Sequence, residues 1–146
     1  MYNKDVKKTA YSLLSRREHS FKELQEKLML KEYSVTDIEP VLTALAEQNI
    51  QSDVRFGEDL FSSRVRKGYG WTYICAELEQ KGLASDIIAS IEQTQSIDWF
   101  EQAEKAYQKR FPDPIINDQK DKAKRVRFLQ SRGFDFEQIS AVLNLD

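Results

Sequence analysis

The chain has 146 residues, of which 40% are hydrophobic and 32% are charged, and its net charge is -2 at pH 7. This composition is typical of a soluble, highly charged helical protein and excludes an intrinsically disordered chain. No apolar run is long enough to span a membrane, the N-terminus lacks the hydrophobic core of an export signal, and the single Cys75 cannot form an internal disulfide. We therefore expect a cytoplasmic protein without a membrane partner.

Residues 1–52 predict three helices. The first has apolar residues at helical spacing and ends at the basic pair Arg16 and Arg17. Ser20 and Glu23 then have the spacing of a capping box, which predicts the start of a second helix. We expect His19, immediately before this cap, to be solvated or to cap the helix.

The third helix of this segment contains Pro40. A proline deep in a helix removes a hydrogen bond and clashes with the preceding turn. We therefore expect Pro40 to lie in the first turn, so that the helix starts near Thr36 or Asp37.

Residues 53–96 predict three more helices. Asp53 is the expected N-cap of the first. Gly68 and Gly70 can adopt backbone angles that are closed to other residues, so they end this helix and allow the next to begin at Trp71 in another direction. Gly82 ends that helix in turn.

Residues 97–146 repeat the pattern. Asp98 with Glu101, and Asp135 with Gln138, have the spacing of helix caps. The sequence FPDP at 111–114 separates the first helix from the second, because each proline disfavours helix at the residue before it. We find no alternating β pattern longer than a few residues.

The three segments are copies of one unit. Leu78 falls on Leu28 when the chain is shifted by 50 residues and on Leu129 when it is shifted by 51, and the second shift also places Gly82 on Gly133. Periods near this length are typical of stacked repeats. The prediction is an all-α fold of three tandem three-helix repeats, stacked into an elongated, curved molecule. Their expected boundaries are 1–52, 53–96 and 97–146.

The charge alternates in sign along the chain. Residues 1–31, 54–76 and 105–132 are basic, and the segments after each of them are acidic. If the repeats stack in register, the basic helices form one ridge. The alternative is that these charges only solvate helix faces.

Residues for catalysis are scarce. His19 is the only histidine, which excludes histidine relays and metal sites that need two histidines. The carboxylates lack metal-binding spacing, and the GYG sequence at 68–70 is not a phosphate loop. We therefore predict no catalytic residues, no metal and no cofactor, and we expect that the protein is not an enzyme.

Binding residues are easier to identify. Arg64, Arg66 and Lys67 lie next to Tyr69, and such mixtures of cations and aromatic rings occur on nucleic-acid-binding surfaces. The strongest basic element is the helix of residues 120–132, which could contact phosphates or an acidic protein surface equally well. Its candidate residues are Lys120, Lys122, Lys124, Arg125, Arg127 and Arg132.

The motifs together resemble a known family. In order, they are YSLLSRREHSFKELQEKL, SDVRFGEDLFSSRVRKGYGWTYICAEL, LEQKGL and FLQSRGF, and they extend over nearly all of the chain. This succession resembles the RecX family of recombination regulators. The resemblance implies tandem three-helix repeats, in agreement with the repeat found from the residues themselves.

The resemblance also implies a partner. Members of this family bind the RecA recombinase, as monomer or filament, and inhibit its ATPase and strand-exchange activities, which affects recombination, DNA repair and the SOS response. When the motifs of the family are transferred by position, the resemblance assigns seven residues to its basic motifs or to its helix junctions. They are Arg16, Arg17, Arg64, Arg66, Lys67, Tyr69 and Arg132. After the glycines, where members tend to have proline and arginines, this chain has Trp71, Thr72 and Tyr73.

Three hypotheses follow. The main one is a monomeric, non-enzymatic regulator that docks a basic ridge on RecA or a RecA–DNA filament, with single- or double-stranded DNA as a further partner. The second is a stand-alone helical DNA-binding module, which would bind DNA tightly without RecA. The third is a scaffold for an unrelated protein, which would neither bind DNA nor affect RecA.

Overall fold

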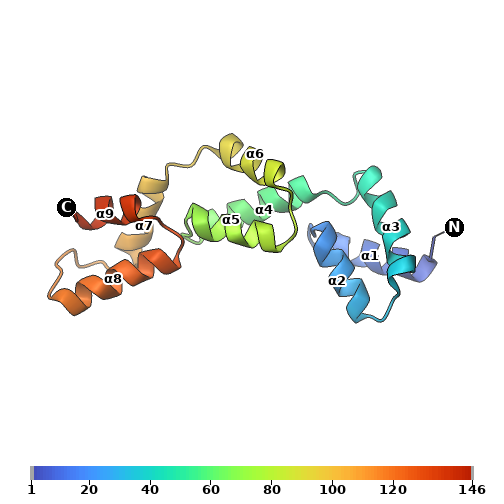
Figure 1. Ribbon diagram of the computed structural model, residues 1–146, viewed down its shortest axis with the longest axis horizontal. Coiled ribbons are helices and arrows are strands. Elements are labelled where there is room, and N and C mark those ends of the chain that lie inside the picture. The colour runs from blue at the N-terminus through green and yellow to red at the C-terminus, as the bar shows by residue number, and fades with distance from the viewer. Residues whose placement is uncertain (1, 146) are drawn as a thin grey trace. The chain divides into compact units, whose positions relative to one another are not determined.

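The computed structural model describes residues 2–145, and these contain nine helices and no strand (Figure 1). The all-α prediction is confirmed. The helices are α1 Lys4–Arg16, α2 Phe21–Leu30, α3 Val35–Glu47, α4 Asp53–Arg66, α5 Trp71–Gln80, α6 Ser85–Gln95, α7 Trp99–Arg110, α8 Gln119–Ser131 and α9 Phe136–Leu143.

The helices form two compact units. Unit 1 comprises Met1–Leu60 and Leu78–Ile91, and unit 2 comprises Phe61–Glu77 and Glu92–Asp146. Helices α4, α5 and α6 therefore each contribute residues to both units. The packing units do not follow the three predicted repeats, so the boundaries 1–52, 53–96 and 97–146 stay a prediction.

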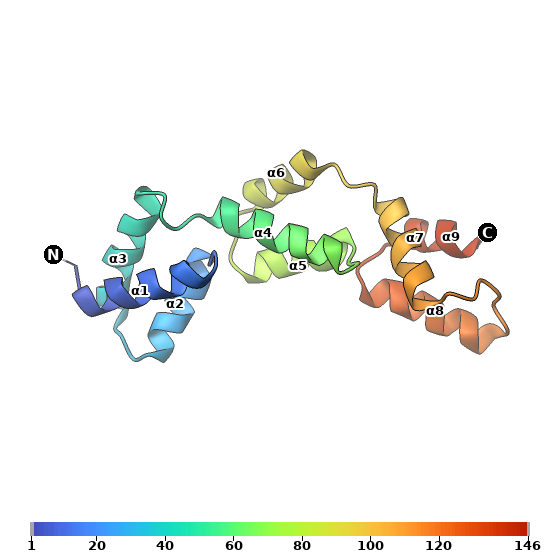
Figure 2. The ribbon, with the colours of Figure 1, turned by 180° about the vertical axis from the view of Figure 1, so that it is seen from behind.

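Unit 1 is centred on α1, α2 and α3, which pack against one another at the N-terminal end of the chain in both views (Figures 1 and 2). Their apolar stripes meet in one buried core. Its residues are Val6, Ala10, Leu24, Leu28, Ile38, Val41, Leu42 and Leu45.

The start of α4 packs in the same unit through Gly57. A Cβ atom at this position would lie 2.5 Å from Ile91 and 2.7 Å from Leu83. Only glycine allows this close approach inside the helix.

Unit 2 contains α7, α8 and α9, which enclose a second core. Its buried residues include Leu129, Phe134 and Ile139. The end of α4 and the start of α5 join this unit through rings: Phe61 lies 5.9 Å from Trp99 and 6.1 Å from Trp71 between ring centroids. Trp71 is partly buried and packs against the rings of Phe61 and Trp99 in unit 2.

Most of the predicted helix caps are confirmed. Ser20 and Glu23 form a reciprocal capping box at α2, Asp135 and Gln138 form another at α9, and Asp98 caps α7. Each satisfies backbone N–H groups that have no partner inside the helix.

The predicted first-turn position of Pro40 is wrong. Helix α3 begins at Val35, where Ser34 caps it, so Pro40 is its sixth residue and lies in the second turn. The Ser34 hydroxyl accepts a hydrogen bond from the amide of Asp37 and fixes the helix start ahead of the proline. The exposed proline then removes one helical hydrogen bond without ending the helix.

The predicted N-cap at Asp53 is also wrong. Ser52 caps α4, because its hydroxyl accepts from the amide of Arg55 at 3.1 Å. Asp53 is the first helical residue, and its carboxylate accepts from the amide of Phe21 at 2.9 Å and from the side chain of Gln51 at 2.9 Å. Its role is therefore to connect α4 to the start of α2 within unit 1.

Candidate binding cleft

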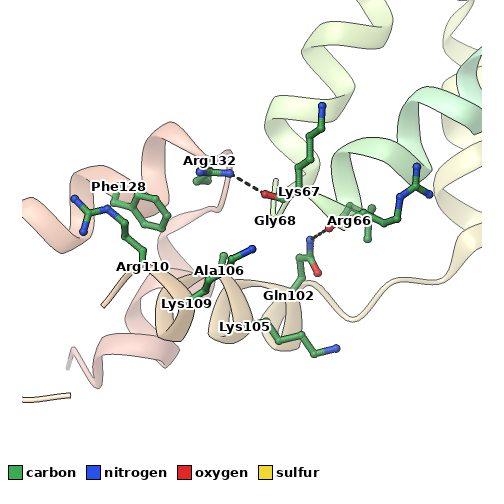
Figure 3. Close-up of a pocket in the computed structure, with 11 residues that line it drawn as sticks. Arg66, Lys67, Gly68, Gln102, Lys105, Ala106, Lys109, Arg110, Phe128 and Arg132 are labelled. Carbon is green, nitrogen blue, oxygen red and sulfur yellow. Dashed lines mark hydrogen bonds between the residues drawn. The ribbon is translucent and has the colours of Figure 1, made fainter. Parts of the chain in front are cut away.

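Unit 2 contains a cleft of about 530 Å³, enclosed by the C-terminal ends of α4 and α8 and by one face of α7 (Figure 3). We refer to it as the cationic cleft. It is lined by Val65, Arg66, Lys67, Gly68, Gln102, Lys105, Ala106, Lys109, Arg110, Phe128 and Arg132.

Two glycines bring the ends of α4 and α8 together. The amide of Gly70 donates to the carbonyl of Arg132 at 2.7 Å, and Arg132 Nη1 donates to the carbonyl of Lys67 at 2.9 Å. A Cβ on Gly70 would lie 2.6 Å from the carbonyl oxygen of Gly133, and a Cβ on Gly133 would overlap the backbone nitrogen of Tyr73. Both positions therefore need glycine for the backbones to approach.

The prediction that Gly68 and Gly70 act through their backbone angles is right only for the first. Gly68 has φ +88°, in the left-handed region that favours glycine, whereas Gly70 is not among the residues with positive φ. The role of Gly70 is steric, and sequence alone does not show which backbone lies against it.

Helix α7 is held against α4 by one side chain. Gln102 Nε2 donates to the carbonyl of Val65 at 2.7 Å and to that of Tyr69 at 3.3 Å, which satisfies acceptors at the end of α4. Lys105 and Lys109 lie one turn apart on α7, and this contact orients the face that carries them toward the cleft.

The lining has six cations and no carboxylate. Among the described residues, Lys105 pairs with Glu101 at 3.0 Å, but both side chains are well exposed and such pairs are weak. No carboxylate of residues 2–145 pairs with Arg66, Lys67 or Lys109. The cleft therefore has a strongly positive charge, which among the described residues only the exposed Lys105–Glu101 pair offsets.

Aromatic rings form part of the cleft wall. The guanidinium of Arg132 lies 5.1 Å from the ring centroid of Phe128 and 4.6 Å from that of Tyr69, which in turn stacks on Tyr73 at 4.2 Å. Arg110 lies 5.9 Å from Phe128. These cation–π contacts hold the two guanidiniums in place without neutralising them.

The charged groups point in different directions in Figure 3. Lys109 extends toward the space between Arg132 and Gln102, whereas Arg66 and Lys105 extend outward. Lysine and arginine have long flexible stems, so those around the opening can turn toward a bound anion.

The predicted site residues separate into several groups. Arg66, Lys67 and Arg132 line the cleft, and Tyr69 contacts Arg132 beside it. Arg64 does not line it, because its guanidinium makes a two-bond ion pair with Glu77 at 2.7 and 2.8 Å. This hydrogen bonding raises the pKa of Arg64.

Arg125 is not available for a partner, which corrects its prediction as a contact residue. Its side chain is buried, donating to the Tyr107 hydroxyl at 2.7 Å and to the carbonyls of Asp113 and Ile115 at 2.9 Å each. It also pairs with Asp121, and the hydrogen bond lowers the pKa of that carboxyl. Arg125 therefore fixes the connection between α7 and α8.

The remaining basic residues of α8 do not line the cleft. Lys120, Lys124 and Arg127 are exposed, and Lys122 is half-buried. Binding by these four residues stays a prediction.

Arg16 and Arg17 belong to unit 1, and both are exposed. Arg17 makes a two-bond ion pair with Glu23, at 3.1 Å for each bond, and Lys81 Nζ lies 3.2 Å from the same carboxylate. Burial alone would raise the pKa of Glu23, but hydrogen bonds from Arg17, Ser20 and Lys81 lower it to about 2. We refer to Glu23, Arg17 and Lys81 as the Glu23 cluster.

His19 is buried, so the expectation that it is solvated is wrong. Lys27 Nζ lies 2.9 Å from its Nε2, and because an ammonium can only donate, Nε2 is the acceptor. Nδ1 then carries the hydrogen and donates to the carbonyl of Arg17 at 3.0 Å. Burial, together with the charges of Arg17 and Lys27, lowers the pKa of His19.

Lys105, Lys109 and Arg110 were missed by sequence reasoning. They lie in a basic segment of the chain, on a helix that also carries the acidic residues Glu101 and Glu104. Their lysine-to-lysine spacing of four residues is a signal that could have indicated one common face. The direction of that face depends on Gln102, which the pattern does not indicate.

Within residues 2–145, no group of three or more histidine, cysteine, aspartate or glutamate side chains is arranged to hold a metal ion. None of the helices described is long and apolar enough to cross a membrane.

Comparison with known protein families finds a match for each of the three segments of the chain. Models of the first, second and third three-helix domains of RecX match residues 7–45, 52–90 and 96–143, respectively. The chain belongs to the RecX family. The predicted architecture of three tandem three-helix repeats is confirmed.

Individual RecX proteins are similar over nearly the full length. The chain is 41% identical to the regulatory protein RecX of Vibrio parahaemolyticus over 140 residues, covering 96% of this chain and 90% of the relative. It is also 41% identical to that of Chromohalobacter salexigens, covering 89% and 85%. This relationship supports a regulatory role within the RecX family.

Solved RecX structures have the same fold. The crystal structure of RecX from Lactobacillus salivarius matches with a TM-score of 0.74 at 20% identity, covering 97% of this chain and 96% of that one. A second RecX crystal structure matches with a TM-score of 0.79 at 21% identity, covering 97% and 74%.

Proposed function

We propose that this protein is a non-enzymatic regulator that binds RecA, as monomer or as a filament on DNA, and inhibits its ATPase and strand-exchange activities. In the cell this would modulate recombination, DNA repair and the SOS response from the cytoplasm. The observation that carries the proposal is membership of the RecX family across all three three-helix domains.

The physical features are compatible with such a role. Tandem repeats supply several surfaces in one chain, and binding through linked surfaces strengthens attachment to a repetitive partner. The cationic cleft supplies a charged surface of the kind that speeds and orients association.

ATP hydrolysis by RecA on single-stranded DNA tests this proposal. The protein is titrated into the reaction up to about one molecule per RecA subunit. We expect hydrolysis to fall progressively during the titration. Unchanged hydrolysis at equimolar protein would overturn the proposal.

A stand-alone DNA-binding module is the second candidate function, and the six cations that line the cleft favour it. It predicts steeply salt-dependent DNA binding without RecA and no effect on RecA hydrolysis once free DNA is in excess. The same titration with added competitor DNA separates the two. Inhibition that persists supports regulation through RecA, and inhibition that disappears supports simple competition for DNA.

A further inference from the structure

We propose that Lys27 is a modification site, at which a small acyl phosphate transfers its acyl group to the side-chain amine with His19 as the base. Both residues belong to unit 1, and neither lines the cationic cleft. The inference goes beyond the proposed function, because it concerns chemistry on the protein itself, and its test does not require RecA.

The first argument is the arrangement of a nucleophile and a base. Lys27 Nζ lies 2.9 Å from Nε2 of His19. The other ring nitrogen, Nδ1, donates to the carbonyl of Arg17 at 3.0 Å, and this bond fixes the tautomer in which the lone pair of Nε2 faces Lys27. An amine within hydrogen-bond reach of a base, which a third group orients, is the arrangement that activates nucleophiles in covalent catalysis.

The surrounding charge favours the neutral, reactive form of the amine. Three cations act on Lys27, from Arg16, Arg17 and Lys81. The carboxylate of Glu23 opposes them, but it already pairs with two of the three. Burial, together with these cations, lowers the pKa of Lys27. A larger fraction of this amine is therefore uncharged near neutral pH than for an ordinary lysine.

The proposed reaction is a simple acyl transfer. The neutral amine of Lys27 donates one N–H to Nε2 of His19, which leaves the lone pair of Nζ directed away from the ring. This lone pair attacks the acyl carbon, so that an Nζ–C bond forms and the C–O bond to phosphate breaks, with its electron pair remaining on the phosphate oxygen. Nε2 takes the proton that Nζ releases and passes it to the leaving phosphate. The products are an acyl-lysine and inorganic phosphate.

The same charges indicate the class of acyl donor. An acyl phosphate is a small dianion, which the cations around Lys27 attract. Arg16 and Arg17 are exposed, so their guanidinium groups can contact the phosphate oxygens. A small donor is also favoured because Lys27 is half-buried.

The contacts of Lys27 are compatible with the product. The amide of an acyl-lysine keeps one N–H, which can still donate to Nε2 of His19. Acylation removes one positive charge from a place where several cations repel one another. We therefore expect unit 1 to stay folded after the modification, with one positive charge fewer on α2.

Competition between two lysines of one peptide tests the inference. Cleavage after Glu26 and Glu32 releases the peptide KLMLKE, which contains Lys27 and Lys31. Lys31 is exposed and lies one turn further along, so it is the internal control. The folded protein is treated briefly with acetyl phosphate near neutral pH. Fragment ions of the peptide then give the ratio of acetylation at the two positions.

We expect Lys27 to be acetylated at least about fivefold faster than Lys31, although it is the less exposed of the two. The ratio should decline as pH rises toward about 10.4, the ordinary pKa of a lysine, because exposed amines then also lose their charge. It should also be close to about 1 in denaturant, where the contact with His19 is lost. A ratio of one or less in the folded protein, or one that denaturant leaves unchanged, would overturn the inference.

His19→Gln separates the base from the surrounding charges. The glutamine keeps an acceptor for Lys27 but cannot take up a proton. The ratio should fall by at least about threefold in this variant, provided that circular dichroism shows it to be helical. An unchanged ratio would overturn the role of His19 as the base. Should the variant fail to fold, the wild-type ratio and its pH profile decide the question.

None of these measurements depends on inhibition of RecA. Selective acetylation of Lys27 in a protein that leaves RecA hydrolysis unchanged would support the inference and overturn the proposed function. Inhibition of RecA by a protein whose Lys27 is no more reactive than Lys31 would do the reverse.

Discussion

The Glu23 cluster of unit 1 and the cationic cleft of unit 2 use the same residue types in opposite ways. In the cluster, Arg17 and Lys81 converge on one buried carboxylate, which accepts hydrogen bonds from both. In the cleft, six cations line one hollow with no carboxylate in the lining. The cluster is an internal ion pair that holds elements together, whereas the lining of the cleft has no carboxylate to pair with its cations.

The difference shows that the number of basic residues in a segment does not predict where an anion binds. Arg17 is a basic surface residue in the sequence, but its charge is already satisfied. Lys109 looks like an ordinary helix charge, but it points into a hollow whose lining has no carboxylate. The property that matters is whether a carboxylate lies opposite the cation.

The largest expected loss of stability comes from placing a side chain at the close backbone contact of Gly133. Gly133→Ala should lower the free energy of unfolding by about 3 kcal/mol, because the residue has φ +95° and its new Cβ would overlap the backbone of Tyr73. Chemical denaturation measures this loss.

Gly68→Ala is the matched control for Gly133→Ala. It has a similar φ of +88°, but its Cβ would lie 3.6 Å from Ala106, an ordinary contact. Its loss should be about 1–2 kcal/mol, from backbone strain alone. Equal losses for the two variants would contradict the steric role of the junction.

The second prediction concerns a variant that lacks the carboxylate at the centre of the Glu23 cluster. Glu23→Gln keeps an acceptor for the capping box but leaves Arg17 and Lys81 without their carboxylate. We expect a loss of about 2 kcal/mol at pH 7, reduced from the full linkage value because Arg17 is half exposed. Glu26→Gln, at a well-exposed pair with Lys22, should change stability by less than about 0.5 kcal/mol.

The pH dependence of the Glu23 effect follows from its pKa, which falls from the ordinary 4.5 to about 2 in the folded protein. A lowered carboxyl pKa stabilises the fold above the unfolded value, and this contribution is lost as pH falls through the folded value. The difference between wild type and Glu23→Gln should therefore shrink from about pH 4.5 to about pH 2. A constant difference over this range would contradict the charge-based account.

A third prediction compares two arginines on the same helix. Arg64→Gln leaves the half-buried Glu77 without its two-bond partner and should cost about 1 kcal/mol. Arg66→Gln removes an exposed cation that has no ion pair among the described residues, and it should cost less than about 0.5 kcal/mol. Thermal unfolding distinguishes them, and the opposite order would show that the pairing has been assigned to the wrong arginine.

The smallest expected effect concerns His19. Because its pKa is lowered in the folded protein, the unfolded chain binds its proton first, and stability declines as pH falls below about 6.5. His19→Gln should remove this part of the decline between about pH 7 and pH 5. Parallel stability curves for the two proteins across this range would show that His19 does not contribute.

Much of the fold could be predicted because its signals are local. Capping pairs such as Ser20 with Glu23 lie three residues apart, and glycines such as Gly133 mark helix ends directly. Pro40 and Asp53 were misplaced because neighbouring serines supply the caps, and several polar residues in a row make the cap ambiguous.

The cleft could be predicted only in part. Arg66, Lys67 and Arg132 stand in basic runs beside glycines, so the pattern indicates them. The burial of Arg125 and the direction of Lys109 depend on contacts between helices distant in sequence, namely those of Tyr107 with Arg125 and of Gln102 with Val65. Local spacing contains no information on these contacts.

RecA-catalysed ATP hydrolysis on single-stranded DNA, measured with wild type and two triple variants, tests most directly whether the cations of the cleft carry the regulatory contact. The account predicts that wild type and K120Q/K124Q/R127Q suppress hydrolysis alike, whereas R66Q/K67Q/K109Q needs at least about tenfold more protein for the same suppression. Equal suppression by all three proteins would contradict it.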